Sequence, residues 1–437
     1  MTKKNSPLNA QELQLIEGLR EHPALMERFE SILEISANAD GPIKRADEVE
    51  GLLIEEMRRL GNTTMGSWAA SAEKRLGEQL EQKDGSATER KKKTLTWWCV
   101  FGLIRVADRV WRTSQKKYLR LLPETIGVTA RGRSRRLERV LTDFGCEHSF
   151  IHAAARVREH YGFEISASAV REATFKHAQR AQDMLEQQYQ EPFRILPSDG
   201  AQYVVAQADG SMICTVAPGK RKDKRPRDWK EIRLTAAQAQ GKAETFYAAT
   251  FGEVDEVGRR WGHCARSAGW GLKSQIHALG DGAEWIRLQS REVFGRQGTF
   301  LCDFFHVSEY LGEAAQSCRA QAPDQWRRTQ QKRLKRGALG KVIAALAAHL
   351  EPAATPDEEA PVRNGHRYLT NRTDCLDYPR ALKLGLPIGS GMIESGHRHV
   401  LQARLKKAGA AWLVEHADQI ANLRVLRANG QWLSLWN

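Results

Sequence analysis

Apolar residues recur three and four positions apart through most of residues 1–82, which is the periodicity of amphipathic helices. The clearest stretches are LNAQELQLIEGLREHP, LMERFESILEISA and ADEVEGLLIEEMRRLG. The segment carries no chemical motif, and we therefore predict a small helical layer or a dimerisation arm.

The next two segments differ sharply in polarity. Residues 83–93 (KDGSATERKKK) are polar and charged, which predicts a linker. The following TLTWWCVFGLIRVADRVWR alternates apolar and polar positions in parts and contains β-branched and aromatic residues, so we predict a short hairpin there.

Residues 149–184 predict a helix-turn-helix. SFIHAAARVREHY supplies the first helix, Gly162 the break, and Ser166 or Ser168 the cap of a second helix through Arg180. Such helix pairs are also common in plain helical domains, so a DNA-reading role depends on the basic segment that precedes this one.

Strands and helices alternate after Pro197. QYVVAQADGSMICTV predicts two strands joined by a tight turn at Asp209–Gly210, because Asp-Gly is favoured in hairpins. EIRL is a possible third strand. We further expect helices at 253–269, 308–318, much of 319–383 and 393–409, and strands at 273–281 and 298–307. This order predicts an α/β fold with a mixed sheet and helices packed on it.

The composition adds a cellular context. Hydrophobic residues make up 41% and charged residues 27% of the 437 residues, as in soluble globular proteins. No apolar run approaches the ~20 residues of a membrane-spanning helix, and the opening MTKKNSPLNAQEL lacks the apolar core of a secretory signal. Seven cysteines without a CxxC pair fit a reducing cytoplasm and no structural zinc.

The charge points to nucleic acid. The chain carries a net +14, and residues 90–140 alone hold fifteen Lys and Arg against three Asp and Glu. Smaller basic clusters follow at Lys220–Lys230 and Arg327–Arg336. One such cluster can be a solvated face, but three favour a polyphosphate partner, because each neutralised phosphate releases counterions. The DNA-binding candidates are Lys91, Lys92, Arg131, Arg133, Arg135, Arg136 and, near the C-terminus, Arg398.

Two apolar strands end in Asp followed by Gly, at Asp209 and Asp281. Strand ends of such sheets are common places for sites, and carboxylates suit a hard cation such as Mg²⁺. Glu394, after Gly-Ser-Gly, is the natural third ligand, and Arg398 four residues later could hold a phosphate. The alternative for each Asp-Gly pair is a plain turn. Asp199 also precedes Gly and is the rival for the first position.

The motifs ADGSMI, GDGAEWI, CDFFHVSEYL and LPIGSGMIESGHRHVLQARLK, in this order, resemble the catalytic domain of bacterial insertion-sequence transposases of the Mutator-like group. The resemblance covers roughly residues 200–425. It implies a ribonuclease-H-like DDE core with Asp209, Asp281 and Glu394 as catalytic residues and ligands of two Mg²⁺ or Mn²⁺ ions. The family's Asp-x-x-His signature matches Asp303 and His306, and it implies that His306 is a further catalytic residue, which contacts the scissile phosphate or shapes the metal ligands.

The resemblance also implies a domain plan. The catalytic domain would span 195–318 and 384–425, interrupted by a helical insertion at 319–383. It would follow a helical region at 1–82 and a basic DNA-binding region at 83–190. Relatives carry paired zinc-binding cysteines before the helix-turn-helix, whereas only isolated Cys99 and Cys146 occur here.

The sequence thus predicts a cytoplasmic, nucleoid-associated bacterial transposase with no membrane partner. It would bind double-stranded element ends and target DNA as a homodimer or larger assembly, and cleave and join strands. A structure-selective nuclease of the resolvase type and a catalytically retired DNA-binding regulator remain as alternatives. A guide RNA or helper protein is left open.

Overall fold

The computed structural model describes residues 8–37, 42–219 and 225–437. The contacts divide the chain into two units, one up to Thr174 and one from Phe175 onward, which are described separately. In the described part of the chain, none of the helices combines the length and the apolar character needed to cross a membrane. The first five residues of the basic cluster Lys220–Lys230 lie outside the described residues.

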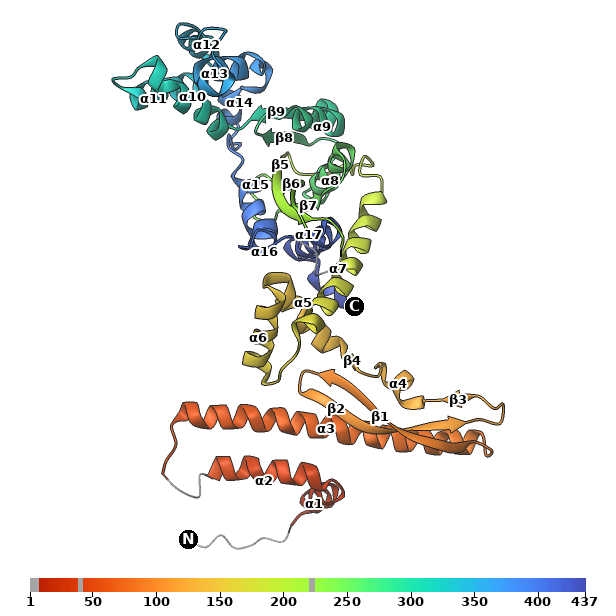
Figure 1. Cartoon of the computed structure of the whole chain (residues 1–437). Helices are drawn as coiled ribbons and strands as arrows, with labels where there is room; N and C mark the ends of the chain where they lie inside the picture. The colour runs from red at the N-terminus through yellow and green to blue at the C-terminus, as the bar shows by residue number, and fades with distance from the viewer. Residues whose placement is uncertain (1–7, 38–41, 220–224) are drawn as a thin grey trace. The chain divides into compact units, whose positions relative to one another are not determined.

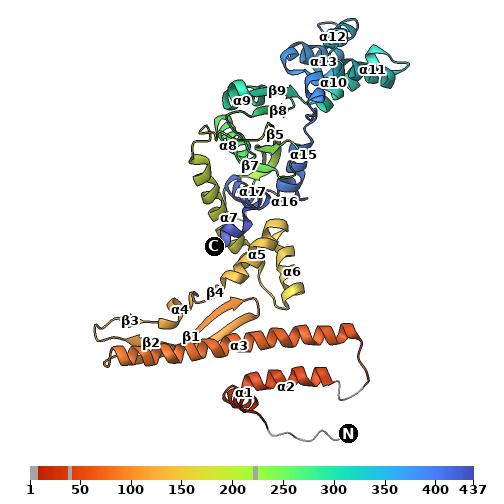
Figure 2. The same cartoon turned by 180° about the vertical axis from the view of Figure 1, so that it is seen from behind.

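The first unit begins with helices, as predicted. They are α1 (Ala10–Glu21), α2 (Pro23–Ala37) and the long α3 (Ala46–Lys83). Asn9 caps α1, since its side chain accepts hydrogen bonds from the N–H groups of Gln11 and Glu12. α2 packs along α3 (Figures 1 and 2).

A four-stranded sheet of order β3-β2-β1-β4 follows. Its members are β1 (Thr88–Cys99), β2 (Gly102–Arg112), β3 (Tyr118–Leu119) and β4 (Gly132–Arg133), with the short α4 (Leu121–Ile126) after β3. The predicted hairpin is confirmed as β1–β2, and Trp97 and Ile104 pack with Ala69 of α3. The predicted linker at 83–93 is wrong, because Lys83 ends α3 and residues 88–93 belong to β1.

Three helices complete the basic region. They are α5 (Arg135–Glu147), α6 (Phe150–Tyr161) and α7 (Ala167–Gln190), the last of which continues into the second unit. The predicted helix pair is confirmed: Gly162 ends α6 with φ +69° and the Ser166 hydroxyl accepts a hydrogen bond from the N–H of Ala169. α7 runs ten residues beyond the predicted end at Arg180. Leu137, Val157 and Val170 share one core.

The second unit is built on a mixed five-stranded sheet of order β7-β6-β5-β8-β9. Its strands are β5 (Tyr203–Val216), β6 (Arg227–Ala239), β7 (Phe246–Thr250), β8 (Gln275–Gly280) and β9 (Gly298–Cys302). β5, β6 and β7 pair antiparallel, whereas β8 and β9 add parallel to β5. The predicted α/β character is therefore confirmed at the level of a mixed sheet with helices.

The predicted turn at Asp209–Gly210 is wrong. β5 continues through both residues and pairs with β6 from Val204 to Val216. The tertiary pairing outweighs the local preference of Asp-Gly for a turn. The strand predicted at 298–307 also ends earlier, at Cys302, because Asp303 caps the helix that follows.

Helices cover both faces of this sheet. They are α8 (Val254–Ser267), α9 (Glu284–Phe294), α15 (Gly391–Gly396), the π-helical η4 (His397–Gln402), α16 (Ala403–Leu405) and α17 (Val414–Ala428), whereas α10 (Phe304–Cys318) follows β9 and packs with other helices. The predicted helical stretch 319–383 contains α11 (Pro323–Lys335), α12 (Leu339–Ala347), α13 (Pro361–Thr370) and α14 (Tyr378–Lys383). α10, α11, α12 and α13 pack together as one helical group beside β9 (Figure 1).

Candidate active site

Two adjacent residues of β6 show which faces of the sheet α15 and α8 cover. Gly396 of α15 lies against the side chain of Leu234, whereas Cys264 of α8 lies 3.6 Å from the hydroxyl of Thr235. Because adjacent strand residues point to opposite faces, α15 and α8 cover opposite sides. Asp209 is the register partner of Leu234, so its side chain lies on the α15 face.

Three aspartates occupy one level of three neighbouring strands. The parallel registers pair Gln207 with Leu279 and Gly280 with Cys302. Extending them by one or two residues places Asp209, Asp281 and Asp303 side by side along the sheet. If the strand geometry continued to these positions, their side chains would emerge on the same face, because parallel register partners point the same way.

The segment that leads to Glu394 crosses this face and is tied to two of the three strands, β8 and β5. His277 of β8 donates from Nε2 to the carbonyl of Pro387 at 2.8 Å. The buried amide of Gln207 donates to the carbonyl of Gly389 at 3.3 Å and accepts from the N–H of Ile393 at 2.9 Å. Gln207 therefore fixes the start of α15 two residues from Asp209.

Ser390 connects two of the acidic residues. Its N–H donates to Oδ2 of Asp303 at 2.8 Å, and its hydroxyl lies in contact with the same oxygen and 3.1 Å from Oε1 of Glu394. One hydroxyl proton serves only one acceptor at a time. Ser390 thereby holds Glu394, which is exposed, beside Asp303, which is buried.

The carboxylates act on one another electrostatically. Burial and, to a lesser degree, the negative charges of Asp281, Glu231 and Glu394 together raise the pKa of Asp209 to about 6, while the N–H of Gly210 opposes the shift. The structure therefore brings the three predicted carboxylates, Asp209, Asp281 and Glu394, into one electrostatic neighbourhood. Glu231, on β6, joins them and was not predicted.

The helical insertion holds the turn that carries Asp281. The hydroxyl of Tyr368 donates to the carbonyl of Asp281 at 2.6 Å, and Nε of Arg372 donates to the carbonyl of Gly282 at 2.9 Å. Gly282 has φ +84°, and a Cβ there would lie 2.6 Å from the Tyr368 hydroxyl oxygen. Only glycine satisfies both the conformation and the contact.

The ring of His306 packs with two tyrosine rings rather than with the three aspartates. Its ring packs edge-on against Tyr310 and Tyr368, and Nδ1 lies 3.3 Å from Oε2 of Glu309. Its link to the site runs through Tyr368. Asp303, its partner in the Asp-x-x-His signature, caps α10 by accepting from the N–H groups of Phe305 and His306.

The other predicted residues fall in different places. Asp199 is exposed and precedes β5, whereas Asp209 lies six residues into that strand and level with Asp281, so the geometry favours Asp209.

Arg398 is exposed on η4. His397 is buried and lies with Nε2 3.4 Å from Oδ2 of Asp209, while His399 is exposed. Burial lowers the pKa of His397 to about 4, so its ring is neutral at neutral pH.

The DNA-binding candidates of the first unit differ in exposure. Lys91 and Lys92 are exposed on β1, and Arg131, Arg135 and Arg136 are exposed around the start of α5. Arg133 is half-buried and lies 3.4 Å from Glu172. In the second unit, Trp326, which directly precedes the cluster at 327–336, is buried.

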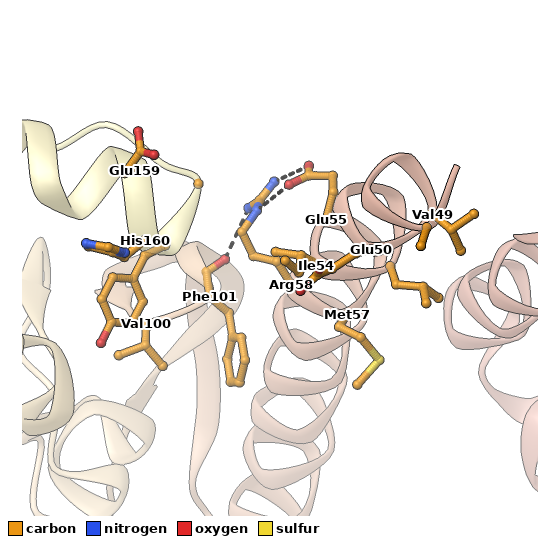
Figure 3. Close-up of a pocket in the computed structure, with 14 residues that line it drawn as sticks. Val49, Glu50, Ile54, Glu55, Met57, Arg58, Val100, Phe101, Glu159 and His160 are labelled. Atoms are coloured by element: carbon orange, nitrogen blue, oxygen red, sulfur yellow. Dashed lines mark hydrogen bonds and ion pairs between the residues drawn. The ribbon is translucent and has the colours of Figure 1, made fainter. Parts of the chain in front are cut away.

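An apolar pocket of about 800 Å³ lies in the first unit (Figure 3). Its walls come from α3, the β1–β2 turn and the end of α6. Arg58 crosses it, donating to the carboxylate of Glu55 and to the carbonyl of Phe101 at 3.4 Å. None of the predicted catalytic residues lines this pocket.

The carboxylates of Asp209, Asp281 and Glu394 suit a hard divalent cation, because carboxylate oxygens are the ligands that Mg²⁺ prefers. Among the described residues, however, no three His, Cys, Asp or Glu side chains converge closely enough to hold an ion. Asp209, Asp281 and Glu394 therefore fit a metal by chemistry and neighbourhood, and their side chains must close in for it to bind.

Sequence reasoning missed several residues of this site. Two of them, Ser390 and His397, contact a carboxylate directly. The other two, Gln207 and Tyr368, hold the backbone next to one. Gln207 had a usable signal, since a polar amide in the apolar run VVAQAD marks a buried hydrogen-bonding position. Tyr368 had none, because 87 residues separate it from Asp281.

Comparison with known proteins gives one match. The model of an uncharacterised protein family, UPF0236, matches residues 271–435. That range contains Asp281, Asp303 and Glu394 with the helical insertion, but it does not include β5 with Asp209. No curated protein matches the chain.

Proposed function

We propose that the chain is a DNA transposase of a bacterial insertion sequence that cleaves and joins DNA strands with a DDE triad. The observation that carries the proposal is the row of Asp209 and Asp281 on adjacent parallel strands, with Glu394 held beside them by Gln207 and Ser390. The raised pKa of Asp209 supports it, because a carboxyl group whose pKa is shifted by burial and, to a lesser degree, by neighbouring negative charges is typical of catalytic sites.

The fold proposal is a ribonuclease-H-like core. It is supported by three consecutive antiparallel strands followed by two strands that add parallel to the first, with helices on both faces. The helices α11–α14, between Asp303 and Glu394, agree with the insertion that the sequence resemblance implies.

Asp209, Asp281 and Glu394 would hold two Mg²⁺ or Mn²⁺ ions. Bound there, such ions activate a water or a 3′-hydroxyl for in-line attack and stabilise the leaving oxygen. The chain's own part is positional. Gln207 and Ser390 fix the start of the Glu394 helix, while Tyr368 and Arg372 fix the turn after β8.

The first unit would bind the element ends. Its support is the density of positive charge in residues 90–140, together with the exposure of Lys91 and Lys92 on β1 and of Arg135 and Arg136 at the start of α5. A helix pair of the predicted type follows directly. Arg398, which is exposed four residues after Glu394, would contact a phosphate. Synapsis of two ends would require a homodimer or larger assembly.

A strand-joining assay tests the proposal. The purified chain is incubated with labelled duplex carrying the repeats that flank its gene, with and without plasmid target, in Mg²⁺ or Mn²⁺. Cleavage followed by joining to the plasmid is the expected result. Cleavage without joining would favour a structure-selective nuclease, and tight binding with no cleavage, even with added host extract, would favour a DNA-binding regulator.

A further inference from the structure

His397 is a buried histidine whose ring faces a predicted catalytic carboxylate. Its side chain is 4% exposed, and Nε2 lies 3.4 Å from Oδ2 of Asp209. Neither ring nitrogen has a hydrogen-bond partner that meets strict geometry among the described residues. Burying an imidazole without hydrogen-bond partners costs free energy, so a buried ring with a carboxylate oxygen nearby calls for a functional explanation.

The approach of His397 to Asp209 is built into the packing. Gly396 lies so close to β6 and β7 that a Cβ would be 3.0 Å from Leu234 and 2.7 Å from the ring of Tyr247. Leu234 is the register partner of Asp209, so this close packing brings the start of η4 to the part of the sheet that carries the carboxylate.

The helix geometry at this point is unusual as well. His397 begins the π-helical segment η4, a rare form that is frequent at functional sites. Arg424 of α17 stabilises the segment by donating to the carbonyls of His399 at 2.6 Å and Val400 at 2.5 Å.

The two oxygens of Asp209 face different donors. Oδ1 accepts from the N–H of Gly210 at 2.8 Å, and Oδ2 faces Nε2 of His397. We infer that His397 is a positioning residue, whose Nε2–H orients the Asp209 carboxylate for cation binding. The inference rests on the proposed function, because it assumes that Asp209 is a metal ligand.

Partners of this kind usually matter for affinity: replacing a group that orients a metal ligand costs about 10- to 100-fold in metal binding. Glutamine extends its amide N–H about as far as Nε2 of histidine, so His397→Gln retains a donor, whereas His397→Leu fills the space without one. His399→Gln is the matched control, because His399 lies two residues away and is exposed.

The test is calorimetric titration of the full chain with Mn²⁺ alone, with the melting temperature of each variant in EDTA as the folding control. We expect His397→Leu to weaken Mn²⁺ binding by about 10-fold or more. His397→Gln should stay close to wild type, and His399→Gln should equal it. Melting temperatures in EDTA should differ little among the variants.

Two results would overturn the inference. Unchanged Mn²⁺ affinity in His397→Leu would remove the role, and equal weakening in the Leu and Gln variants would reduce it to packing. The variant Asp209→Asn distinguishes a failure of this inference from a failure of the proposed function. Mn²⁺ binding that survives Asp209→Asn would reject the metal site itself, whereas binding lost in Asp209→Asn but intact in His397→Leu would reject only the part played by His397.

Discussion

The hydroxyl of Tyr368 donates a hydrogen bond of 2.6 Å to the backbone carbonyl of Asp281. Tyr368 lies on α13, within the helical insertion, and Asp281 follows β8 of the central sheet. The helical segment that contains α13 therefore helps to hold the turn that carries Asp281.

Replacing Tyr368 by Phe should slow cleavage without unfolding the chain. The change removes one hydrogen bond with a net worth of about 0.5–1.5 kcal/mol, which corresponds to a loss of roughly 2- to 10-fold in rate. Tyr310→Phe is the control, because it removes a hydroxyl from the ring stacked on Tyr368. Single-turnover cleavage rates measure the effect, and equal rates in both variants would contradict a role for the bond.

Gln207→Met should affect stability and catalysis together. The variant keeps a similar volume but leaves the N–H of Ile393 unsatisfied in a buried place, at a cost of about 1–3 kcal/mol. Urea unfolding measures the first effect and DNA cleavage the second. Gln238→Met, on the more exposed part of β6, is the comparison. A stability equal to wild type would mean that Gln207 does not tie β5 to the Glu394 helix.

Asp209→Asn should stabilise the chain above pH 6 in the absence of divalent cations. The pKa of Asp209 rises in the fold from 3.8 to about 6, so ionising the carboxylate lowers the stability of the fold progressively between these two pH values. The advantage of the variant should grow between about pH 4 and 6 and then stay constant. Melting temperatures of both proteins at pH 5 and 8 in EDTA measure it. A difference independent of pH would exclude the raised pKa.

The basic strand should contribute to DNA affinity through phosphate contacts. Each contact adds about 0.9 to the slope of log affinity against log salt. The double variant Lys91→Ala/Lys92→Ala should therefore lower that slope by about 2 if both residues touch phosphates. Lys74→Ala/Arg75→Ala on α3 removes the same charge outside the basic region. Equal slope changes in the two variants would indicate a general charge effect.

The sequence predicted the elements with a strong apolar periodicity, but it did not predict strands whose extent depends on pairing with another strand. The N-terminal helices and the helix pair around Gly162 were predictable from apolar spacing and capping. β1 begins six residues before the predicted hairpin, at Thr88 rather than Thr94, because its first seven residues are exposed and show no alternation. Only its pairing with β2 makes that polar segment a strand.

The same limit applies to the candidate site. Asp209, Asp281 and Glu394 came from motifs, and the structure places them in one neighbourhood. Asp209–Gly210 was interpreted as a turn because local preference favours one, yet pairing with β6 carries the strand through it. Tyr368 and Ser390 acquire their roles only from contacts 87 residues apart, which no local pattern encodes.

The most direct test of the DDE assignment compares acidic variants in the cleavage and joining assay. Asp209→Asn, Asp281→Asn and Glu394→Gln remove the three proposed ligands, while Asp199→Asn and Glu231→Gln change carboxylates outside the triad. The account predicts that each of the first three variants binds end DNA but neither cleaves nor joins it, and that the last two retain both steps. Cleavage that survives Asp281→Asn or Glu394→Gln, or that disappears with Asp199→Asn instead of Asp209→Asn, would contradict it.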